Sequence, residues 1–301
     1  LRVNDGSVLF DGTTGTTPAS GAGTRMMWIP DKAAFRAGVV SGTQWDDATI
    51  GVNSAAFGND SYAPGASSFA GGRGKAYGSY SFAFGDSTKV TGTNSAAIGR
   101  NNKAFADNTY IYGLNNISGS SESVILGSSN VDNSNAYNQY VLGSNNILNN
   151  RPYLLVLGTS NTVSSDAAFA IGWGNNSSNA FACTIGRNNV NSGGYGSAIG
   201  EAVNVSGIYG NGLGYKCRVS GTKAIAIGDS SQAIGASSFA ANRGKAYGAF
   251  SVAIGDSCKT STAASYGVAM GYRTTASGEY SFAHGYNNSV SGIGSAVLGG
   301  C

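Results

Sequence analysis

The sequence is poor in the residue types on which most enzymes and compact globular cores depend. Among 301 residues there are one histidine, three tryptophans, four prolines and four cysteines, and only 11% of the residues are charged. A single histidine leaves one unsupported candidate for a Ser-His-Asp triad. Carboxylates do not cluster at a shared position as a glycosidase requires. We therefore expect a protein that is not an enzyme.

Long apolar runs and concentrated charge are also missing. The longest apolar stretch, residues 153–157, is far shorter than the roughly 18 residues that cross a bilayer, so we expect no membrane insertion within this chain. The net charge is +3, and lysine and arginine are scattered along the sequence, which gives no indication of a nucleic-acid partner. The cysteine spacing matches no zinc signature, and we expect no cofactor.

What the sequence has in abundance is glycine, and the glycines are periodic. There are 47, and they do not follow the three-residue period of collagen. A short apolar strand that ends at a landmark residue recurs about every fourteen residues. The landmark is glycine in all cases but Asn242, and it occupies positions 58, 72, 85, 99, 113, 127, 143, 158, 172, 186, 200, 214, 228, 242, 255, 271, 285 and 299. Such a regular array indicates a repeat protein.

Each repeat has room for two short strands and two tight turns, and none for a helix. The second strand follows the landmark by about five residues, as at 89–92 and 218–221. Units of this kind close into coils in which each strand pairs with its equivalent in the next coil. The sequence therefore predicts an all-β fold, a parallel β-roll solenoid with coils of about 14 residues.

The first strand of each coil alternates between small and large side chains. Two residues before the landmark they are small or β-branched, as at Ala83 and Ala226, which suits a narrow interior. The residue immediately before the landmark is large and apolar and faces outward. Such a continuous outer stripe needs a cover, so we expect a parallel homotrimer. The expected trimer-interface residues are Phe84, Ile98, Leu126, Leu142, Leu157, Ile171, Ile185, Ile199, Ile227, Ile254 and Leu298.

The repeat resembles a known family. The segments Ser-Val-Ala-Ile-Gly-Asp-Ser at 251–257 and Ala-Ile-Ala-Ile-Gly-Asp-Ser at 224–230 are similar to the head repeat of the trimeric autotransporter adhesins, whose prototype is the Yersinia adhesin. The resemblance covers roughly residues 51–300. It implies a left-handed β-roll in each chain, three rolls wound into one trimer, and a role in surface attachment. The same roll occurs in phage-type tail fibres.

Two parts of the chain depart from the regular pattern. Residues 1–50 do not follow the period, so we expect an N-terminal cap or connector there and the β-roll repeat domain at 51–301; a docking module for an upstream stalk is the alternative. The longer intervals between landmarks 127, 143 and 158 predict loops, and Tyr137, Tyr140 and Tyr153 are receptor-binding candidates. Plain slack in these loops is the other interpretation.

Polar residues at fixed repeat positions predict structural roles. Seven consecutive coils place asparagine three residues after the landmark, where amides can form a turn ladder from coil to coil. These residues are Asn102, Asn116, Asn130, Asn146, Asn161, Asn175 and Asn189. Glycan or ligand binding is the alternative for this row.

The remaining polar candidates are the cysteines and the single histidine. Cys217 and Cys258 occupy the ladder position and lie three coils apart, too far for a disulfide. With Cys183 and Cys301 we expect them to be reduced, or at most paired between chains. His284 takes the large outward position, where three copies could hold an ion near a trimer axis; a polar plug without a ligand is the alternative.

These observations predict a non-enzymatic trimeric fibre or adhesin head that attaches to a cell surface. Free thiols favour assembly in a reducing compartment, and hence a phage-type or contractile-injection-type tail fibre over a bacterial trimeric autotransporter adhesin. A structural spacer or adaptor in a larger particle is a further alternative, and a carbohydrate-degrading β-helix enzyme is the weakest. The expected partners are two further copies of the chain and a glycan or protein receptor. The expected location is extracellular, on a virion or injection-particle fibre or on the bacterial surface.

Overall fold

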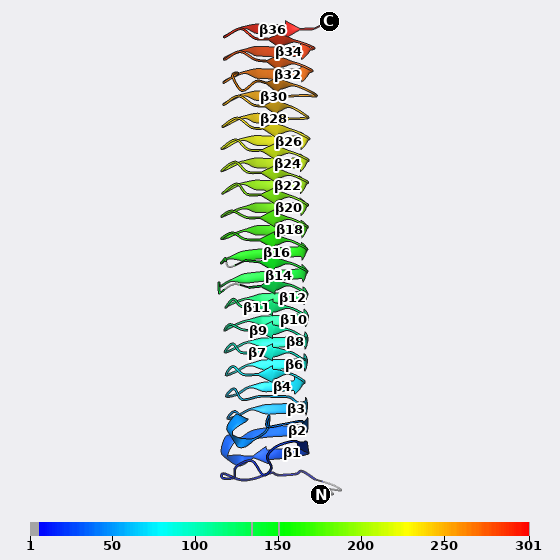
Figure 1. Ribbon diagram of the computed structural model, residues 1–301, viewed down its shortest axis with the longest axis vertical. Helices are drawn as coiled ribbons and strands as arrows, with labels where there is room; N and C mark the ends of the chain where they lie inside the picture. Colours follow the sequence, from blue (N-terminus) through cyan, green and yellow to red (C-terminus); the bar gives the residue numbers. More distant parts are fainter. Residues whose placement is uncertain (1–5, 134, 150, 301) are drawn as a thin grey trace. The chain divides into compact units, whose positions relative to one another are not determined.

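A computed structural model describes residues 6–133, 135–149 and 151–300. The chain forms two compact units, Leu1–Leu142 and Gly143–Cys301. Apart from two 3₁₀ turns, all the regular elements are β-strands, and within each unit the strands stack coil upon coil (Figure 1). This confirms the predicted all-β parallel solenoid. The left-handed winding that the resemblance implies stays a prediction.

The first unit begins with a hairpin and continues as a roll with two kinds of strand. The hairpin and its turns are β1 (Gly23–Ile29), η1 (Pro30–Lys32), β2 (Ala34–Val40) and η2 (Asp47–Thr49). The longer strands are β3 (Ala55–Asn59), β4 (Phe69–Gly72), β6 (Phe82–Asp86), β8 (Ala96–Arg100), β10 (Tyr110–Leu114) and β12 (Val124–Ser128), followed by β14 (Gln139–Ser144). The shorter strands are β5 (Lys75–Ala76), β7 (Lys89–Val90), β9 (Lys103–Ala104), β11 (Ile117–Ser118) and β13 (Val131–Asp132).

The second unit repeats the same alternation of longer and shorter strands. Its longer strands are β16 (Leu154–Thr159), β18 (Phe169–Trp173), β20 (Cys183–Arg187), β22 (Ser197–Glu201), β24 (Asn211–Tyr215), β26 (Ile225–Asp229), β28 (Phe239–Ala241), β30 (Val252–Ile254), β32 (Val268–Tyr272), β34 (Phe282–Tyr286) and β36 (Ala296–Gly299). Its shorter strands are β15 (Ile147–Leu148), β17 (Thr162–Val163), β19 (Asn176–Ser177), β21 (Val190–Asn191), β23 (Asn204–Val205), β25 (Arg218–Val219), β27 (Gln232–Ala233), β29 (Lys245–Ala246), β31 (Lys259–Thr260), β33 (Thr275–Ala276) and β35 (Ser289–Val290).

The landmark glycines set the register between coils. Gly99 pairs with Gly113 and Gly113 with Gly127 in the first unit, so equivalent residues lie above one another in parallel strands. At Gly113 the backbone has φ +137°, and a Cβ there would lie 1.8 Å from the carbonyl oxygen of Gly127. Both the left-handed backbone and the close approach of the next coil require glycine. The spacing of the landmark glycines in the sequence therefore equals the length of one coil.

The alternation of side chains is confirmed. Residues two before the landmark, such as Ala83 and Ala226, have no exposed surface and fill the interior between the two sheets of a coil. They pack with the second residue of the short strands, which is also buried, as at Val205 and Val219. The core is thus a single column of small side chains, as expected for a roll with two strands per coil.

Two further left-handed positions recur along the coils and are mostly occupied by residues other than glycine. One follows the landmark by two residues, as at Asn101 and Asn115, with φ 53° and 56°. The other precedes the next landmark by five, as at Tyr195 and Tyr209, both with φ 57°. Asparagine tolerates this conformation, whereas it is costly for an aromatic residue. The ladder asparagines, three residues after the landmark, do not take this left-handed conformation.

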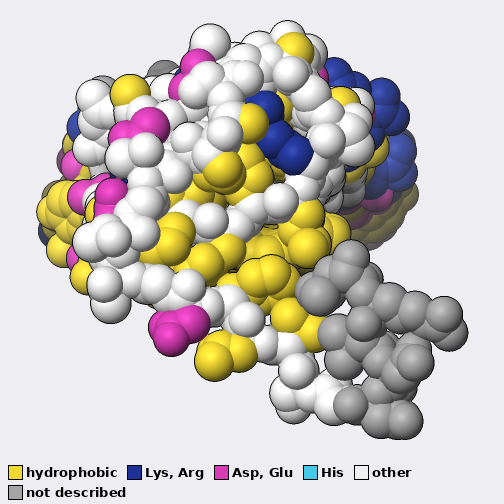
Figure 2. All heavy atoms as spheres, turned by 90° about the horizontal axis from the view of Figure 1, so that it is seen from below, with side chains coloured by type: hydrophobic (Ala, Val, Ile, Leu, Met, Phe, Trp, Pro, Cys, Tyr) yellow, Lys and Arg dark blue, Asp and Glu magenta, His cyan; other side chains and the backbone are white. Residues whose placement is uncertain are grey.

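The N-terminal segment joins the roll. Strand β1 pairs antiparallel with β2, and β2 pairs in parallel with β3, with Gly38 opposite Gly58. The buried Trp45 donates its indole N–H to the carbonyl oxygen of Ser61 at 2.9 Å. Figure 2 looks onto the end of the unit that carries this hairpin, where apolar side chains gather near the centre. The hairpin extends the sheet of the long strands, so β2, which lies within the predicted cap 1–50, is also a strand of that sheet. The domain boundary at residue 50 stays a prediction.

A buried arginine fastens this hairpin to the first coil. Arg36 on β2 has no exposed surface, and its guanidinium donates to the Ser54 hydroxyl at 2.8 Å and to the Ala63 carbonyl oxygen at 3.1 Å. Burial lowers the pKa of this guanidinium to about 10. A buried cation that binds carbonyl groups from two later segments holds β2 in register with the coils.

Candidate functional site

The outward-facing side of the long strands carries the predicted interface row. In the first unit Phe84 is 49% exposed, and in the second unit Leu298 is 71% exposed. Leu126, Leu142 and Ile227 are also exposed, and Ile98, Leu157, Ile171, Ile185, Ile199 and Ile254 are half-buried. All of them point away from the interior of their own coil, as the alternation requires. The structure thus places the whole row on one apolar face within each unit.

A second apolar row lies beside the first, three residues before each landmark, and the sequence analysis missed it. In the first unit Phe69 and Phe82 belong to this row, with ring centroids 4.9 Å apart and planes nearly parallel. In the second unit Phe169, Ile225 and Phe282 occupy the equivalent positions. In the sequence, neither row contains a lysine, arginine, aspartate or glutamate at any coil. The period-two alternation could have revealed this row, since residues two apart on a strand share a face.

Aromatic side chains stack at the corner that precedes the long strands. Phe181, Tyr195 and Tyr209 come from successive coils of the second unit, with centroid distances of 4.9 and 5.0 Å. Phe250, Tyr266 and Tyr280 form a second stack, with distances of 4.9 and 5.1 Å. These rings are about half exposed. Stacking offsets part of the cost of their left-handed backbone.

The three tyrosines predicted to contact a receptor are all exposed but occupy different kinds of position. Tyr137 and Tyr140 lie in the first unit, 44% and 47% exposed. Tyr140 is in the second apolar row, on β14. Tyr153 lies in the second unit, 55% exposed, and takes the left-handed corner position with φ 60°. Receptor binding by these residues stays a prediction, and Tyr140 belongs to the face that would be covered on assembly.

The seven ladder asparagines are buried inside the coils. In the first unit the Asn116 side chain donates to the amide oxygen of Asn102 at 3.1 Å, and Asn130 donates to Asn116 at 3.0 Å. The same bond recurs along Asn146, Asn161, Asn175 and Asn189 of the second unit, at 3.0–3.1 Å. Within each unit, the coils of the ladder are thereby bonded to one another through side chains as well as backbone.

Two cysteines take over the ladder position further along the second unit. The Sγ atom of Cys217 lies 3.1 Å from the carbonyl oxygen of Gly228, and that of Cys258 lies 3.0 Å from the carbonyl oxygen of Gly271. Both are buried, Cys183 is partly buried, and none of the three forms a disulfide within the chain, as predicted. Burial raises the pKa of the Cys183 and Cys217 thiols. Cys301 lies outside the described residues.

The chain offers little to a metal ion. His284 is exposed and stacks on Phe282, with ring centroids 6.5 Å apart. Within residues 6–133, 135–149 and 151–300, no three His, Cys, Asp or Glu side chains come together as a possible metal site. An ion held by His284 at a trimer axis stays a prediction.

Over the same residues, the structure contains no helix with the length and apolar character needed to span a bilayer.

The stacked coils and the glycine register define a parallel β-solenoid with an uncharged outer face. Five segments, 50–74, 76–102, 91–109, 220–241 and 264–288, match the family described as YadA head domain repeat (2 copies). These matches and the stacked coils support a YadA-like head of the trimeric autotransporter adhesin type, a structural, non-enzymatic family whose head domains are typically surface-exposed adhesins. No curated protein matches the chain.

Proposed function

We propose that the chain is a non-enzymatic attachment protein that assembles as a parallel homotrimer through the uncharged face of its long strands. The observation that carries this proposal is the pair of adjoining rows without one charged residue, bordered in part by stacked aromatics. A soluble monomer rarely exposes so large a continuous apolar patch. A second copy in the same orientation offers the same rows at the same spacing, and three copies close a ring without leaving a face open.

The trimer explains why the side chains of the outer rows are large while those of the inner row are small. Inside a coil two sheets approach closely, and alanine fills the gap. Between chains the sheets can separate by the usual distance of about 10 Å, which larger apolar side chains fill. The YadA-head repeats support this arrangement, because they come from a trimeric family.

Assembly can be tested with one substitution and one control. Ile227→Asp places a carboxylate in the outer row, where it would be buried without a partner on assembly, and should convert a trimer into monomers in analytical ultracentrifugation. Lys216→Asp, at an exposed corner of the same unit, should leave the trimer intact. A monomer formed by the unaltered chain at micromolar concentration would overturn the proposal.

Within this function we favour a phage-type or injection-type tail fibre over a bacterial autotransporter. The support is the set of free thiols, two of them buried in the ladder, which suits folding in a reducing compartment. The complete gene and its neighbours distinguish the two: baseplate and chaperone genes favour the fibre, and an encoded outer-membrane anchor favours the autotransporter. Attachment itself is measured by binding of the labelled trimer to cells, and binding that survives removal of all surface glycans and proteins would contradict it.

A further inference from the structure

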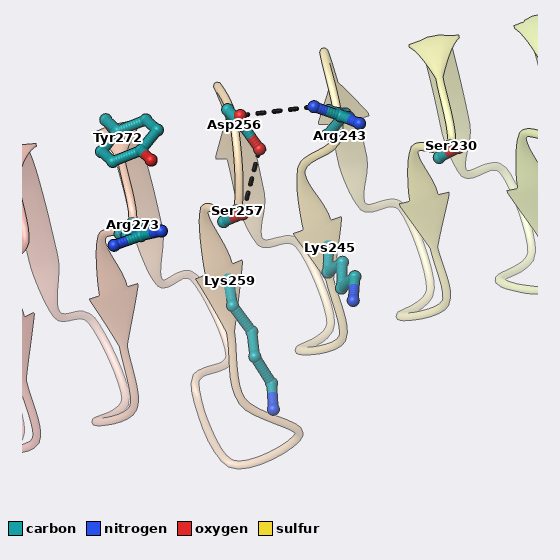
Figure 3. Close-up of a pocket in the computed structure, with 8 residues that line it drawn as sticks. All are labelled: Ser230, Arg243, Lys245, Asp256, Ser257, Lys259, Tyr272 and Arg273. Carbon is teal, nitrogen blue, oxygen red and sulfur yellow. Dashed lines mark hydrogen bonds and ion pairs between the residues drawn. The ribbon is translucent and has the colours of Figure 1, made fainter.

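A basic groove lies on the second unit, away from the apolar face. It is an open hollow of about 480 Å³ over successive coils, and its lining includes Arg243, Lys245, Lys259 and Arg273, with Asp256 as the one acidic residue. Figure 3 shows Lys245 and Lys259 extending from neighbouring coils toward the same side. With Asp229, which pairs with Arg243 beside the groove, four cations and two carboxylates give this small region a formal charge of +2.

The arginines and lysines of the groove differ in how they are neutralised. Arg243 is paired with Asp256 at 3.4 Å and with Asp229 at 3.5 Å. Lys245 and Lys259 form no ion pair with any residue that the structure describes, and they lie directly opposite each other on β29 and β31. Like charges in directly opposed positions destabilise a sheet. A row of lysines kept in this arrangement is therefore better explained by an anionic ligand than by the fold.

The same groove occurs a second time, in the first unit, which is independent support. There the lining includes Arg73, Lys75, Lys89 and Lys103, again with a single acidic residue, Asp60. Arg73, Lys75 and Lys89 lie 170 positions before Arg243, Lys245 and Lys259. The fourth basic residue differs: Lys103 pairs with Lys89 on the short strands, whereas Thr275 pairs with Lys259 and Arg273 lies in the preceding turn. Lys75, Lys89 and Lys103 are likewise directly opposed on β5, β7 and β9. The coil period thus gathers eight of the chain's lysines and arginines into two related basic grooves.

The groove is suited to a linear polyanion, and the aromatic rings in it or beside it already face cations. Tyr272, the aromatic residue in the lining, faces the guanidinium of Arg273 at 5.0 Å and stacks on Tyr286. Beside the two grooves, the ammonium of Lys259 lies 5.4 Å from the ring centre of Tyr247, and that of Lys89 lies 5.3 Å from Tyr77. Binding of single-stranded nucleic acid relies on open aromatic faces on which bases stack. Sulfate and carboxylate groups need only the ammonium and guanidinium donors, and the hydroxyl of Ser257, which also lines the groove, can bind a sugar hydroxyl.

We propose that these two grooves bind acidic polysaccharide, a linear sugar chain that carries sulfate or carboxylate groups on successive residues. Lysines on neighbouring coils repeat at the strand spacing of about 4.8 Å, so the chain lies across the coils and meets one cation per coil. The inference goes beyond the proposed function, because it requires neither the trimer nor the tyrosines near 137–153.

Isothermal titration calorimetry with a sulfated dextran oligosaccharide tests the proposal. The unaltered protein should bind two oligosaccharides per chain, with an affinity that falls about tenfold or more between about 50 and 200 mM NaCl. Lys245→Gln with Lys259→Gln should leave one site per chain, and adding Lys75→Gln with Lys89→Gln should leave none. The control pair Lys216→Gln and Lys223→Gln removes the same charge from exposed positions outside the grooves and should keep both sites.

The remaining probes identify the ligand class. An oligogalacturonate that binds the same two sites supports carboxylate recognition, and neutral dextran should not bind. A single-stranded DNA oligomer that binds the grooves more tightly than the sulfated sugar would overturn the assignment to polysaccharide. If the control pair lost binding sites, or if the fourfold variant kept both, the two grooves would not be the binding sites. Circular dichroism spectra that match the unaltered chain show that a variant is folded, so a lost site is a loss of binding.

Discussion

The asparagine ladder gives the sharpest quantitative prediction, and Asn175→Ala is the change that tests it. The Asn175 side chain donates to the amide oxygen of Asn161 at 3.0 Å and to the carbonyl oxygen of Gly186 at 2.9 Å. Its own amide oxygen accepts from the backbone N–H of Asn189 at 3.2 Å and from the Asn189 side chain at 3.1 Å. One side chain therefore connects three successive coils of the second unit.

The magnitude follows from what the truncation leaves behind. The Asn189 backbone N–H is buried and would lose its acceptor, and the Gly186 carbonyl oxygen would lose a side-chain donor. A buried polar group without a partner costs about 1–3 kcal/mol, and the half-buried Gly186 carbonyl adds less because water can reach it. The affected coils should open correspondingly more often, and amide exchange in residues 161–200 should accelerate by roughly 5-fold or more.

The chain itself offers the matched variant. At Cys217 a thiol occupies the ladder position, donates to the Gly228 carbonyl oxygen and accepts from the backbone N–H of Ser231. Asn175→Cys should therefore cost about half as much as Asn175→Ala or less. Asn176→Ala, at the adjacent outward-facing position, should change exchange little.

Hydrogen exchange followed by mass spectrometry measures the effect, because a solenoid opens locally rather than all at once. The predicted order of exchange rates is Ala fastest, then Cys, then the unaltered chain together with the Asn176 control. If Asn175→Ala exchanged like the unaltered chain, or if Cys were as harmful as Ala, the ladder bonds would not stabilise the coils.

Three further predictions concern a landmark glycine, a buried thiol and the corner aromatics. Gly113→Ala should destabilise the first unit by about 3 kcal/mol or more in urea unfolding, whereas Gly294→Ala, with open space around its Cβ, should cost only about 1–2 kcal/mol of left-handed strain; equal costs would refute the close-approach argument. Burial raises the pKa of the Cys217 thiol above 9.0, so its contribution to stability is present below pH 9 and is lost as the pH rises through the folded-state pKa. In the unaltered chain the urea midpoint should therefore fall between about pH 8 and about pH 11, and in the Cys217→Asn variant this fall should be smaller. If the two proteins had the same pH profile, the prediction would be wrong. Tyr195→Gly should be more stable than Tyr195→Ala by about 1 kcal/mol in thermal unfolding, because alanine loses the stacking but keeps the strain; the opposite order would show that the strain is negligible.

The coil and its interior could be predicted from the sequence because they follow from a period and an alternation. The spacing of the landmarks predicted the parallel register, and the small residues at Ala83 and Ala226 predicted the inner column. The left-handed corners could not be predicted from residue preferences, since Tyr195 and Phe181 occupy a backbone conformation that aromatics avoid. Tertiary stacking overrides the local preference at these positions.

The basic grooves were missed for a different reason. Lys75, Lys89 and Lys103 lie fourteen residues apart, so a search for charge runs along the sequence finds none. Once the coil period is known, the same residues form a column, because positions one period apart become neighbours in space. The relevant signal is a duplication at an offset of 170 residues, by which the segment 66–78 returns in closely similar form at 236–248.

The two sheets of a coil differ in the chemistry they present, and this separates assembly from ligand binding. The outer side of the long strands carries no charge at Ile227 or at its equivalents, while the short strands present the lysines at 245 and 259. Substitutions on the two sheets therefore have no partners in common, and their effects on the affinity of a single groove should add. Binding to a surface coated with acidic polysaccharide should behave otherwise, because a trimer presents three copies of each groove and gains by multivalency. Ile227→Asp should thus leave the affinity for a short oligosaccharide unchanged while weakening adhesion to the coated surface, a combination that only the joint action of the two faces produces.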